Sequence, residues 1–388
     1  MISTFHQVLL CIDLTNRTFP FSEARETLTG MTRATSPTPR AGSTLSDVLD
    51  AWSGADPLRL ATADTVARLA SASIRLAHLI AAAPHRADEL PDVSDLGDLS
   101  EGGDTPKPLD LAAEGVLLDV LEGSQVAAVA SEESRSPVPV NTEGSLVVAV
   151  DPIDGSSNID IAAPIGTIFS VLPLATPGQD PAAALLQSGR HQLAAGFTIY
   201  SACTVLVLTL GSGTDAYVLD PDSGDYRLVF AGLRVPDDSP EYAINASNAR
   251  HWPPGIRSYI SDMVEGADGP RKSDFNMRWV AALVAEAYRI LLRGGIYLYP
   301  ADARPGYEKG RLRLVYEANP IALIFEQAGG AATNGVERIL DLQPEDHHQR
   351  TPLAFGSAAK VERVGRHLSQ LVVADSSPLF GSRGLFRA

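Results

Sequence analysis

Two carboxylates, a glycine and two hydroxyl groups occur within seven consecutive residues of this chain. Asp151 and Asp154 follow the apolar, β-branched run 147–150, which predicts a buried strand. Because Pro152 has no N–H to donate to a neighbouring strand, we expect the strand to end there and both acids to project from its carboxyl end. Two carboxylates on a rigid strand end suit a hard divalent cation such as Mg²⁺, which prefers oxygen ligands.

The residues after these acids could bind an anion. Gly155, Ser156 and Ser157 offer backbone N–H groups and hydroxyl groups, and we expect them at the start of a helix, where a phosphate is held favourably. Metal-binding acids joined to a phosphate cradle indicate chemistry on a phosphate ester. The alternative interpretation of the local sequence is an Asp-Pro turn followed by a serine helix cap.

Length and charge limit the class of protein. A chain of 388 residues predicts two domains or one large layered domain. The formal net charge of -16 excludes non-specific nucleic-acid binding, which needs a basic surface. Two cysteines, Cys11 and Cys203, provide neither a disulfide framework nor a thiolate metal site, so a reducing, cytoplasmic location is expected.

The first 43 residues differ in composition from the rest. Their short apolar run, residues 8–12, is ended by Asp13 before it could span a membrane, and no basic segment precedes it. We therefore expect no secretory signal and no membrane partner. Residues 15–43 are rich in Thr, Ser, Pro and Arg, which predicts a flexible N-terminal extension over residues 1–43.

The elements that must position these residues alternate between helices and strands. Apolar spacing predicts helices from residue 45 and over 60–83, 109–122, 279–292 and 320–327. Strands are predicted at 126–130, 165–174, 192–198, 204–210, 215–219, 226–230, 242–245 and 296–299. A linker at 236–240 divides an N-terminal domain over 44–236, which carries the acidic loops, from a C-terminal substrate-binding domain over 237–388. This alternation favours layered α/β sheets.

The run 151–160 resembles the signature of class I fructose-1,6-bisphosphatases. Further matches occur in the same order along the chain, at Gly103-Asp104, Asp110, Ser131-Glu132-Glu133, 294–300, 312–320 and 326–330. The likeness extends from about Thr44 to Lys360. It implies an α/β fold of the sugar phosphatase type, a five-layer α-β-α-β-α sandwich, in a homo-oligomer that is usually a tetramer.

The resemblance also implies a metal site. Its ligands would be the carboxylates of Glu132, Glu133, Asp151, Asp154 and Glu317 and the backbone carbonyl of Ile153. Two or more Mg²⁺ ions per subunit, with Mn²⁺ as a possible substitute, would activate water and stabilise developing oxygen charge. The catalytic acids implied are Asp104, Asp110 and Glu133, of which the last two would orient or deprotonate the attacking water. The alternatives are a helix N-cap for Asp110 and an ordinary loop acid for Asp104.

A second set of residues is implied to bind the substrate. Gly155, Ser156 and Ser157 would hold the reacting phosphate and Asn245 the distal phosphate, while Arg278 would reach across a subunit boundary. The full set implied is Asp154, Gly155, Ser156, Ser157, Asn245, Arg278, Tyr297, Leu298, Tyr299 and Arg311. Packing within the strand is the alternative for Tyr297.

Departures from the family pattern concern the substrate pocket and regulation. Arg311 stands where animal enzymes have lysine, and Trp279 replaces a phosphate-binding tyrosine. The loop 301–310 is about two residues longer than the bacterial pattern. Asp64, placed by the resemblance at a helix start, would oppose a nucleotide phosphate, so inhibition by AMP of the usual kind is not expected.

The function implied is hydrolysis of the 1-phosphate of fructose 1,6-bisphosphate, which yields fructose 6-phosphate and phosphate. Sedoheptulose 1,7-bisphosphatase or dual-specificity activity is the alternative, because the two sugars differ by one carbon between their phosphates. An inositol-phosphatase-like enzyme would share the acidic motif, but Asn245 and the block 299–317 favour a sugar bisphosphatase. Retention of the acidic ligands opposes a non-catalytic homologue.

Overall fold

The computed structural model describes residues 41–85, 90–91, 107–174, 176 and 179–376. Residues 1–40 of the predicted extension and the acidic loop that carries Asp104 lie outside the described residues. The end of the extension, residues 41–43, is not free: the Gly42 N–H donates to the Leu228 carbonyl, and the Ser43 carbonyl accepts the Leu228 N–H, both at 2.9 Å.

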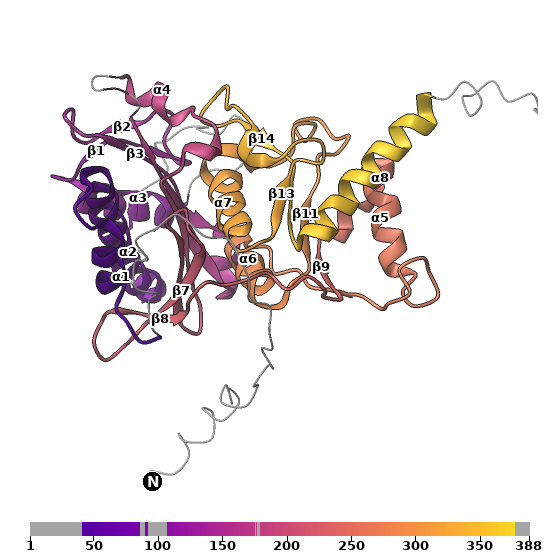
Figure 1. Ribbon diagram of the computed structural model, residues 1–388, viewed down its shortest axis with the longest axis horizontal. Coiled ribbons are helices and arrows are strands. Elements are labelled where there is room, and N and C mark those ends of the chain that lie inside the picture. Colours follow the sequence, from indigo (N-terminus) through magenta and orange to yellow (C-terminus); the bar gives the residue numbers. More distant parts are fainter. Residues whose placement is uncertain (1–40, 86–89, 92–106, 175, 177–178, 377–388) are drawn as a thin grey trace, which may run out of the picture. The chain divides into compact units, whose positions relative to one another are not determined.

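Three helices cover one face of a large sheet (Figure 1). They are α1 (Leu45–Ser53), α2 (Pro57–Ala82) and α3 (Pro108–Leu121). Helix α2 begins where the sequence chemistry favours it, because the Asp56 carboxylate accepts the N–H groups of Leu58 and Arg59 and Pro57 needs no partner at the first helical position. Apolar stripes of these helices, including Val66 and Leu117, pack on the sheet.

The large sheet has eight strands in the order β2-β1-β3-β4-β5-β6-β7-β8. The strands are β1 (Val126–Ser131), β2 (Val138–Pro139), β3 (Leu146–Asp154), β4 (Ile165–Pro173), β5 (Ala194–Tyr200), β6 (Thr204–Thr209), β7 (Thr214–Leu219) and β8 (Tyr226–Phe230). Strands β1 and β3 pair in parallel, and the other pairs are antiparallel. Every residue of β3 is buried, since helices cover both faces of the sheet at that strand.

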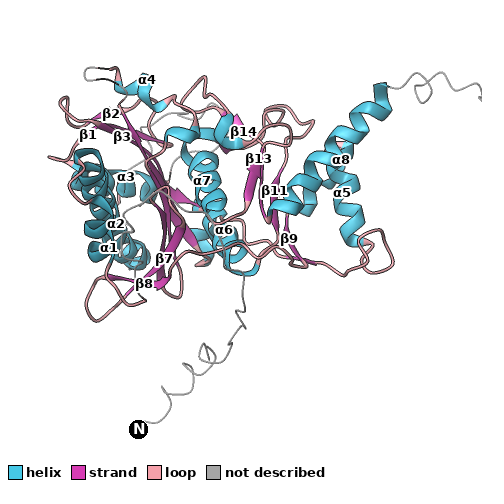
Figure 2. Cartoon of the chain, in the orientation of Figure 1, coloured by secondary structure: helices cyan, strands magenta, loops and turns pink. Residues whose placement is uncertain are grey.

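A central helical layer separates this sheet from a smaller one (Figure 2). It contains α6 (Leu283–Arg293) and α7 (Asn319–Gln327). The smaller sheet has the order β10-β9-β11-β15-β13, with β9 (Glu241–Ala243), β10 (Asn276–Met277), β11 (Ile296–Tyr299), β13 (Ala331–Thr333) and β15 (Leu353–Gly356). Its outer face carries α5 (Pro254–Val264) and α8 (Ala358–Ser376). The layers therefore alternate as α-β-α-β-α, which confirms the predicted five-layer sandwich.

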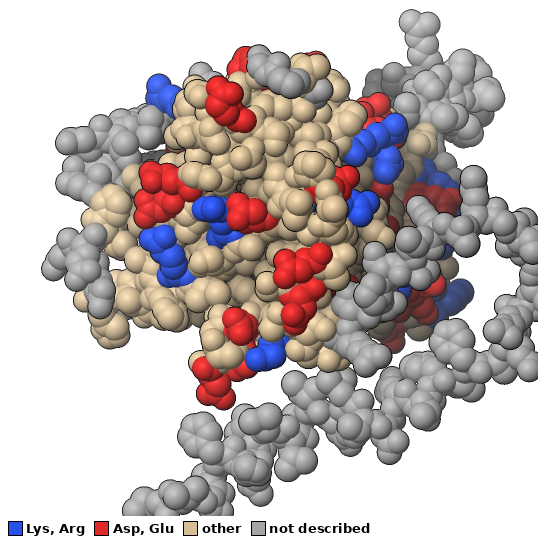
Figure 3. All heavy atoms as spheres, turned by 60° about the vertical axis from the view of Figure 1, so that its left-hand side comes forward, with Lys and Arg blue, Asp and Glu red and all other residues tan. Residues whose placement is uncertain are grey.

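Short elements complete the chain. They are the helix α4 (Pro181–Leu185) and a two-stranded ladder of β12 (Leu312–Arg313) and β14 (Arg350–Thr351). Among the described residues, no helix has both the length and the apolar composition that crossing a membrane requires. Acidic and basic side chains are interspersed on the described part of the face drawn in Figure 3.

Two predicted boundaries were wrong. Strand β3 does not end at Pro152 but continues to Asp154, because the pairing with β4 shifts register between Asp151 and Asp154 and such an irregularity tolerates proline. Helix α6 begins at Leu283 rather than at Trp279. The backbone before it is held out of the helix by Ala281, which has a φ of +61°.

The expected position of Asp64 was also wrong. Asp64 lies well inside α2, whose N-cap is Asp56, and it forms an ion pair with Arg68 at 2.7 Å. The neighbouring Thr65 is buried and donates its hydroxyl to the carbonyl of Ala61. The argument that Asp64 opposes a phosphate at a helix start therefore loses its structural basis.

Candidate active site

Three buried carboxylates converge where β3 meets the central helical layer. Asp151 and Asp154 lie at the end of β3, and Glu317 lies in the π-helical turn Leu314–Ala318 that precedes α7. One carboxylate oxygen from each residue lies within 4.8 Å of the others. Burial, followed by repulsion from neighbouring carboxylates, raises the pKa of Asp151 and of Glu317 well above the ordinary value. Burial also raises the pKa of Asp154, to about 6.

Backbone hydrogen bonds orient two of these carboxylates. Asp154 accepts the N–H of Val284 through Oδ2 at 2.8 Å, and Glu317 accepts the N–H of Arg313 through Oε2 at 2.5 Å. The irregular end of β3 is held by the Thr167 hydroxyl, which donates to the Pro152 carbonyl at 2.8 Å. The acids are thus set in place by β3, α6 and the turn before α7.

Parallel pairing of β1 with β3 brings two more acids to the cluster. Ser131 pairs with Val150, and the N–H of Glu132 donates to the Val150 carbonyl at 3.1 Å. Burial, followed by repulsion from the carboxylates of Asp110 and Glu132, raises the pKa of Glu133 to about 8.

Asp110 reaches the same cluster from the first turn of α3. Its Oδ2 accepts the N–H of Lys107 at 2.7 Å, so part of the predicted capping role is present, with Lys107 and not Asp110 as the N-cap residue. Its Oδ1 is buried and has no hydrogen-bond partner among the described residues. Burial raises the pKa of Asp110 to about 6.

This donor set fits hard divalent cations. It consists of carboxylate oxygens, three of which converge, and buried like charges need a cation to remain ionised together. The unpartnered oxygen of Asp110 adds a further acceptor beside Glu133. The side chain of Ile153 is buried in the core, as expected if only its backbone carbonyl were to serve as a ligand.

The turn after β3 is held against the segment that precedes α6. Gly155 has a φ of +77°, and a Cβ at this position would lie 2.8 Å from the Cβ of Ala282. Ser156 and Ser157 begin a 3₁₀ helix, Ser156–Ile161, and not the α-helix start that would give a full helix dipole. The Nζ of Lys107 donates to the Ser156 carbonyl at 2.8 Å.

Three aromatic side chains form a row beside the acids. Alternation along β11 places Tyr297 and Tyr299 on one face of the sheet, and Trp279 stacks on Tyr297 at 5.8 Å between ring centroids. The centroid of Trp279 lies 6.1 Å from that of Tyr299. The packing role considered for Tyr297 is therefore real, since the residue is also 4% exposed and stacks on Phe355.

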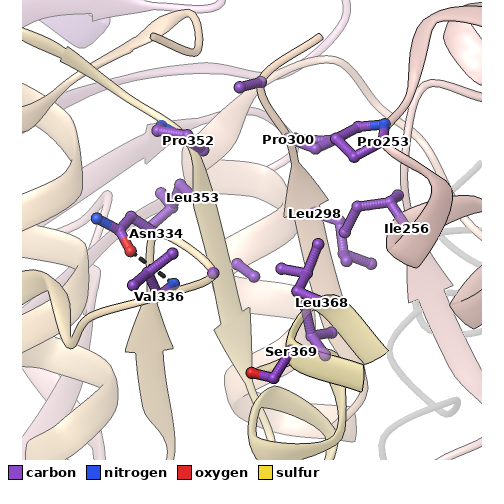
Figure 4. Close-up of a pocket in the computed structure, with 14 residues that line it drawn as sticks. Pro253, Ile256, Leu298, Pro300, Asn334, Val336, Pro352, Leu353, Leu368 and Ser369 are labelled. Atoms are coloured by element: carbon purple, nitrogen blue, oxygen red, sulfur yellow. Dashed lines mark hydrogen bonds between the residues drawn. The ribbon is translucent and has the colours of Figure 1, made fainter. Parts of the chain in front are cut away.

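Leu298 lies between these tyrosines but faces the opposite side of the sheet. There it lines a cavity of about 480 Å³ under α5 and α8, together with Ile256 and Leu368 (Figure 4). The structure does not bring its side chain to the acidic cluster, because successive residues of a strand point to opposite faces.

The remaining predicted substrate residues lie on segments that follow β9, follow β10 and precede β12. Asn245 caps the 3₁₀ helix Ala246–His251 through its side-chain oxygen, which accepts the Ser247 N–H. Arg278 is exposed beside the edge strand β10 and lies 3.7 Å from Glu241. Arg311 donates from its NH1 to the Tyr307 hydroxyl at 3.1 Å.

Comparisons with known proteins agree with this arrangement. Residues 62–231 match the family model described as the N-terminal domain of fructose-1-6-bisphosphatase, and residues 235–369 match that of the C-terminal domain. The chain belongs to the fructose-1,6-bisphosphatase family. A class 1 fructose-1,6-bisphosphatase of Azorhizobium caulinodans is 53% identical over 84% of this chain and 98% of the relative, and one of Bradyrhizobium diazoefficiens is 48% identical over 88% and 98%.

A solved structure of the family has the same fold. Fructose-1,6-bisphosphatase from Leishmania major, crystallised in holo form, superposes with a TM-score of 0.77 at 28% identity, over 85% of this chain and all of that one.

Two residues of the site, Arg313 and Glu286, were not among those predicted from the sequence. Arg313 donates its Nε to Glu132 at 3.3 Å and its NH1 to the His348 carbonyl at 2.8 Å. In the sequence, Arg313 is a charged residue between two leucines within the 312–320 match, and that setting could have indicated it.

Glu286 is the second of these residues, and its side chain is fully buried in α6. It accepts the Val280 N–H at 2.7 Å and pairs with Arg289, which in turn pairs with Glu241. These bonds hold the backbone next to Trp279. An acid on the apolar face of the predicted 279–292 helix could have indicated it.

Proposed function

We propose that this protein hydrolyses the 1-phosphate of fructose 1,6-bisphosphate, with Mg²⁺ as its cofactor. The observation that carries the proposal is the opposite charge at the two ends of the aromatic row. Burial raises the pKa of Tyr297, and repulsion from Tyr299 and from the carboxylates of Asp154 and Glu317 adds to the rise. Burial also raises the pKa of Tyr299, but there the positive charges of Arg311 and Arg304 oppose the rise. A cation-binding end and an anion-binding end, joined by a flat apolar floor, suit a sugar that carries two phosphates.

The acidic end is where the scissile phosphate would lie. Bound divalent ions would activate water and stabilise charge on phosphate oxygens there. Asp151, Asp154 and Glu317 would hold the ions, with Glu132, Glu133 and the Ile153 carbonyl completing the set. We propose that Asp110 and Glu133 accept the proton of the attacking water, because both combine burial with a raised pKa. N–H groups and hydroxyls of Gly155, Ser156 and Ser157 would bind the phosphate.

Phosphate release tests this function. The purified protein is given fructose 1,6-bisphosphate, sedoheptulose 1,7-bisphosphate and an inositol monophosphate, each with Mg²⁺ or with a chelator. We expect Mg²⁺-dependent release from fructose 1,6-bisphosphate and none from the inositol ester. A comparable rate on the seven-carbon sugar would indicate dual specificity. Release from the inositol ester alone would contradict the proposal.

We further propose that the protein is a homo-oligomer, of the tetrameric kind, in which Arg278 completes the site of a neighbouring copy. The support is that Arg278 adjoins the edge strand β10 and is exposed, as is Met277. An open strand edge with an exposed apolar side chain is suited to contact another chain.

Mixing two inactive variants checks the shared site. Arg278→Ala subunits combined with Asp151→Asn subunits are expected to regain part of the activity, because a hybrid contains one site with both residues intact. Each variant alone is the control. No recovery, although mass spectrometry shows that subunits have exchanged, would mean that Arg278 serves its own chain.

Metal removal should make stability depend on pH. The carboxyl pKa values of Glu133, Asp110 and Asp154 are raised in the folded protein, so the folded state binds more protons than the unfolded state between about pH 4 and about pH 8. In the metal-free protein, the stabilisation contributed by these carboxyls is complete below the pKa values that they have in the unfolded chain. It is lost as pH rises through the higher pKa values of the folded protein. Mg²⁺ should therefore raise Tm more at about pH 8.5 than at about pH 6, because ligand carboxyls must lose protons to bind it.

Thermal unfolding of chelator-treated protein, with and without Mg²⁺, measures this difference. Asp151→Asn, which lacks one of the buried acids, should show a smaller gain from Mg²⁺ at both pH values. An equal or larger Mg²⁺ effect at the lower pH would contradict the assignment of the cluster as the metal site.

A further inference from the structure

The loop between β11 and β12 carries two arginines that share one aromatic ring. The guanidinium carbon of Arg304 lies 4.3 Å from the centroid of the Tyr307 ring, and that of Arg311 lies 5.0 Å from it. Arg311 also donates to the Tyr307 hydroxyl at 3.1 Å. Both contacts are within the range of cation–π attraction, so a single side chain holds both cations.

Asp302 fixes the direction of the first arginine. Its carboxylate is buried and accepts from the Nε of Arg304 at 2.9 Å, while the NH2 of Arg304 bonds the other oxygen. This fork uses one edge of the guanidinium and leaves NH1 without a hydrogen-bond partner among the described residues. The Arg304 side chain is 30% exposed, so the remaining edge is accessible to a ligand.

The position of this loop relates it to the far end of the proposed site. Burial raises the pKa of Tyr299, and the positive charges of Arg311 and Arg304 oppose this rise. Asp154 and Glu317 act instead on Tyr297, so Tyr299 is the end of the aromatic row that is remote from the acids. The backbone of the loop is tied by the Ala303 N–H to the His251 carbonyl at 3.4 Å, at the end of the 3₁₀ helix that begins after Asn245. The loop is thus tied to the segment that begins with Asn245, the residue implied to bind the distal phosphate.

We propose that Arg304 binds the phosphate that is not hydrolysed, and that Tyr307 is the positioning residue that holds Arg304 and Arg311 toward it. This inference rests on the proposed function. Trp279 offers one indole N–H on the floor of the site, so a doubly charged phosphate needs cations from elsewhere. The guanidinium groups of Arg304 and Arg311 would be these cations. Because the Tyr307 ring already holds both side chains, they would lose little rotational freedom when phosphate binds.

Product inhibition separates the two ends of the site. For Arg304→Gln we expect KM for fructose 1,6-bisphosphate and the inhibition constant of fructose 6-phosphate to rise about tenfold, the lower end of what one charge-assisted hydrogen bond supplies. The inhibition constant of inorganic phosphate and kcat should stay unchanged, because both depend on the acidic end. Lys309→Gln removes an equal charge from an exposed position in the same loop and should alter none of these values.

Two substitutions at Tyr307 test positioning. Tyr307→Phe keeps the ring and should stay within about threefold of the wild type, whereas Tyr307→Leu should match Arg304→Gln. Circular dichroism and Tm verify folding of each variant. Equal losses for fructose 6-phosphate and inorganic phosphate, or no change in Arg304→Gln, would overturn the inference. A wild-type protein that releases no phosphate from the bisphosphate would instead refute the proposed function.

Discussion

Replacing Asp151 with asparagine is expected to lower kcat by about a thousandfold or more while the protein remains folded. Asp151 is one of three buried carboxylates whose oxygens converge within 4.8 Å, and an amide offers one neutral oxygen in place of a charged ligand. Several kcal/mol of charge stabilisation at the phosphate depend on ions that this set would hold. Steady-state phosphate release with saturating Mg²⁺ measures the loss.

Stability distinguishes this effect from misfolding. Because the pKa of Asp151 is raised by burial and by repulsion from its neighbours, its charge is unfavourable in the metal-free fold. The variant should therefore unfold, in the presence of chelator, at a temperature equal to or above that of the wild type. Asp119→Asn, at a surface ion pair with Arg75, is the matched control and should keep full activity. A folded Asp151→Asn protein with near-normal turnover would remove the metal assignment.

Gly155→Ala should lower kcat/KM by about a hundredfold. The added Cβ would lie 2.8 Å from the Cβ of Ala282 and 3.2 Å from its Cα, so the turn or the segment before α6 must move. The same segment supplies the Val284 N–H to Asp154, and a displacement near 1 Å between phosphate-binding and metal-binding groups costs about that factor.

A second glycine variant separates the effect of backbone strain from the effect of the clash with Ala282. Gly123 has a φ of +71°, close to that of Gly155, but a Cβ there would have no neighbour within 4 Å. Gly123→Ala carries the left-handed strain without the clash and should lose about 1 kcal/mol of stability with activity unchanged. If both alanine variants lost activity equally, the contact with Ala282 would not be the cause.

Contiguous features of the site could be predicted from the sequence. The run 147–150 is apolar and mostly β-branched, which favours a strand buried on both faces, and the acids at 151 and 154 follow it directly in the chain. Helix starts such as that of α2 are determined in the same local way, by Asp56 and Pro57. The five layers follow from the order of such segments and from the family resemblance.

Local rules failed where a side chain from the next helix or from a neighbouring strand supplied the hydrogen bond. Trp279 continues the apolar spacing of α6, but the Glu286 carboxylate accepts the Val280 N–H and the helix begins four residues later, at Leu283. Pro152 reads as the end of a strand, but the Thr167 hydroxyl on β4 satisfies its carbonyl and β3 continues. The helix and strand propensities of a segment depend on its own residues, whereas these two hydrogen bonds each join that segment to another one.

Neighbouring residues were enough to predict which acids are adjacent in the chain, where the glycine turn lies and which segments are apolar enough to be buried. The family resemblance grouped Glu132 and Glu317 with these acids, but the fold shows how they meet: Glu132 comes beside Asp151 through the parallel pairing of β1 and β3, and Glu317 enters from the turn before α7. The fold also turns Leu298 away from the site. It also placed Arg304 and Arg311 on one tyrosine ring. The reason is that charge repulsion, stacking and shared burial depend on distances through space, which spacing along the chain does not specify.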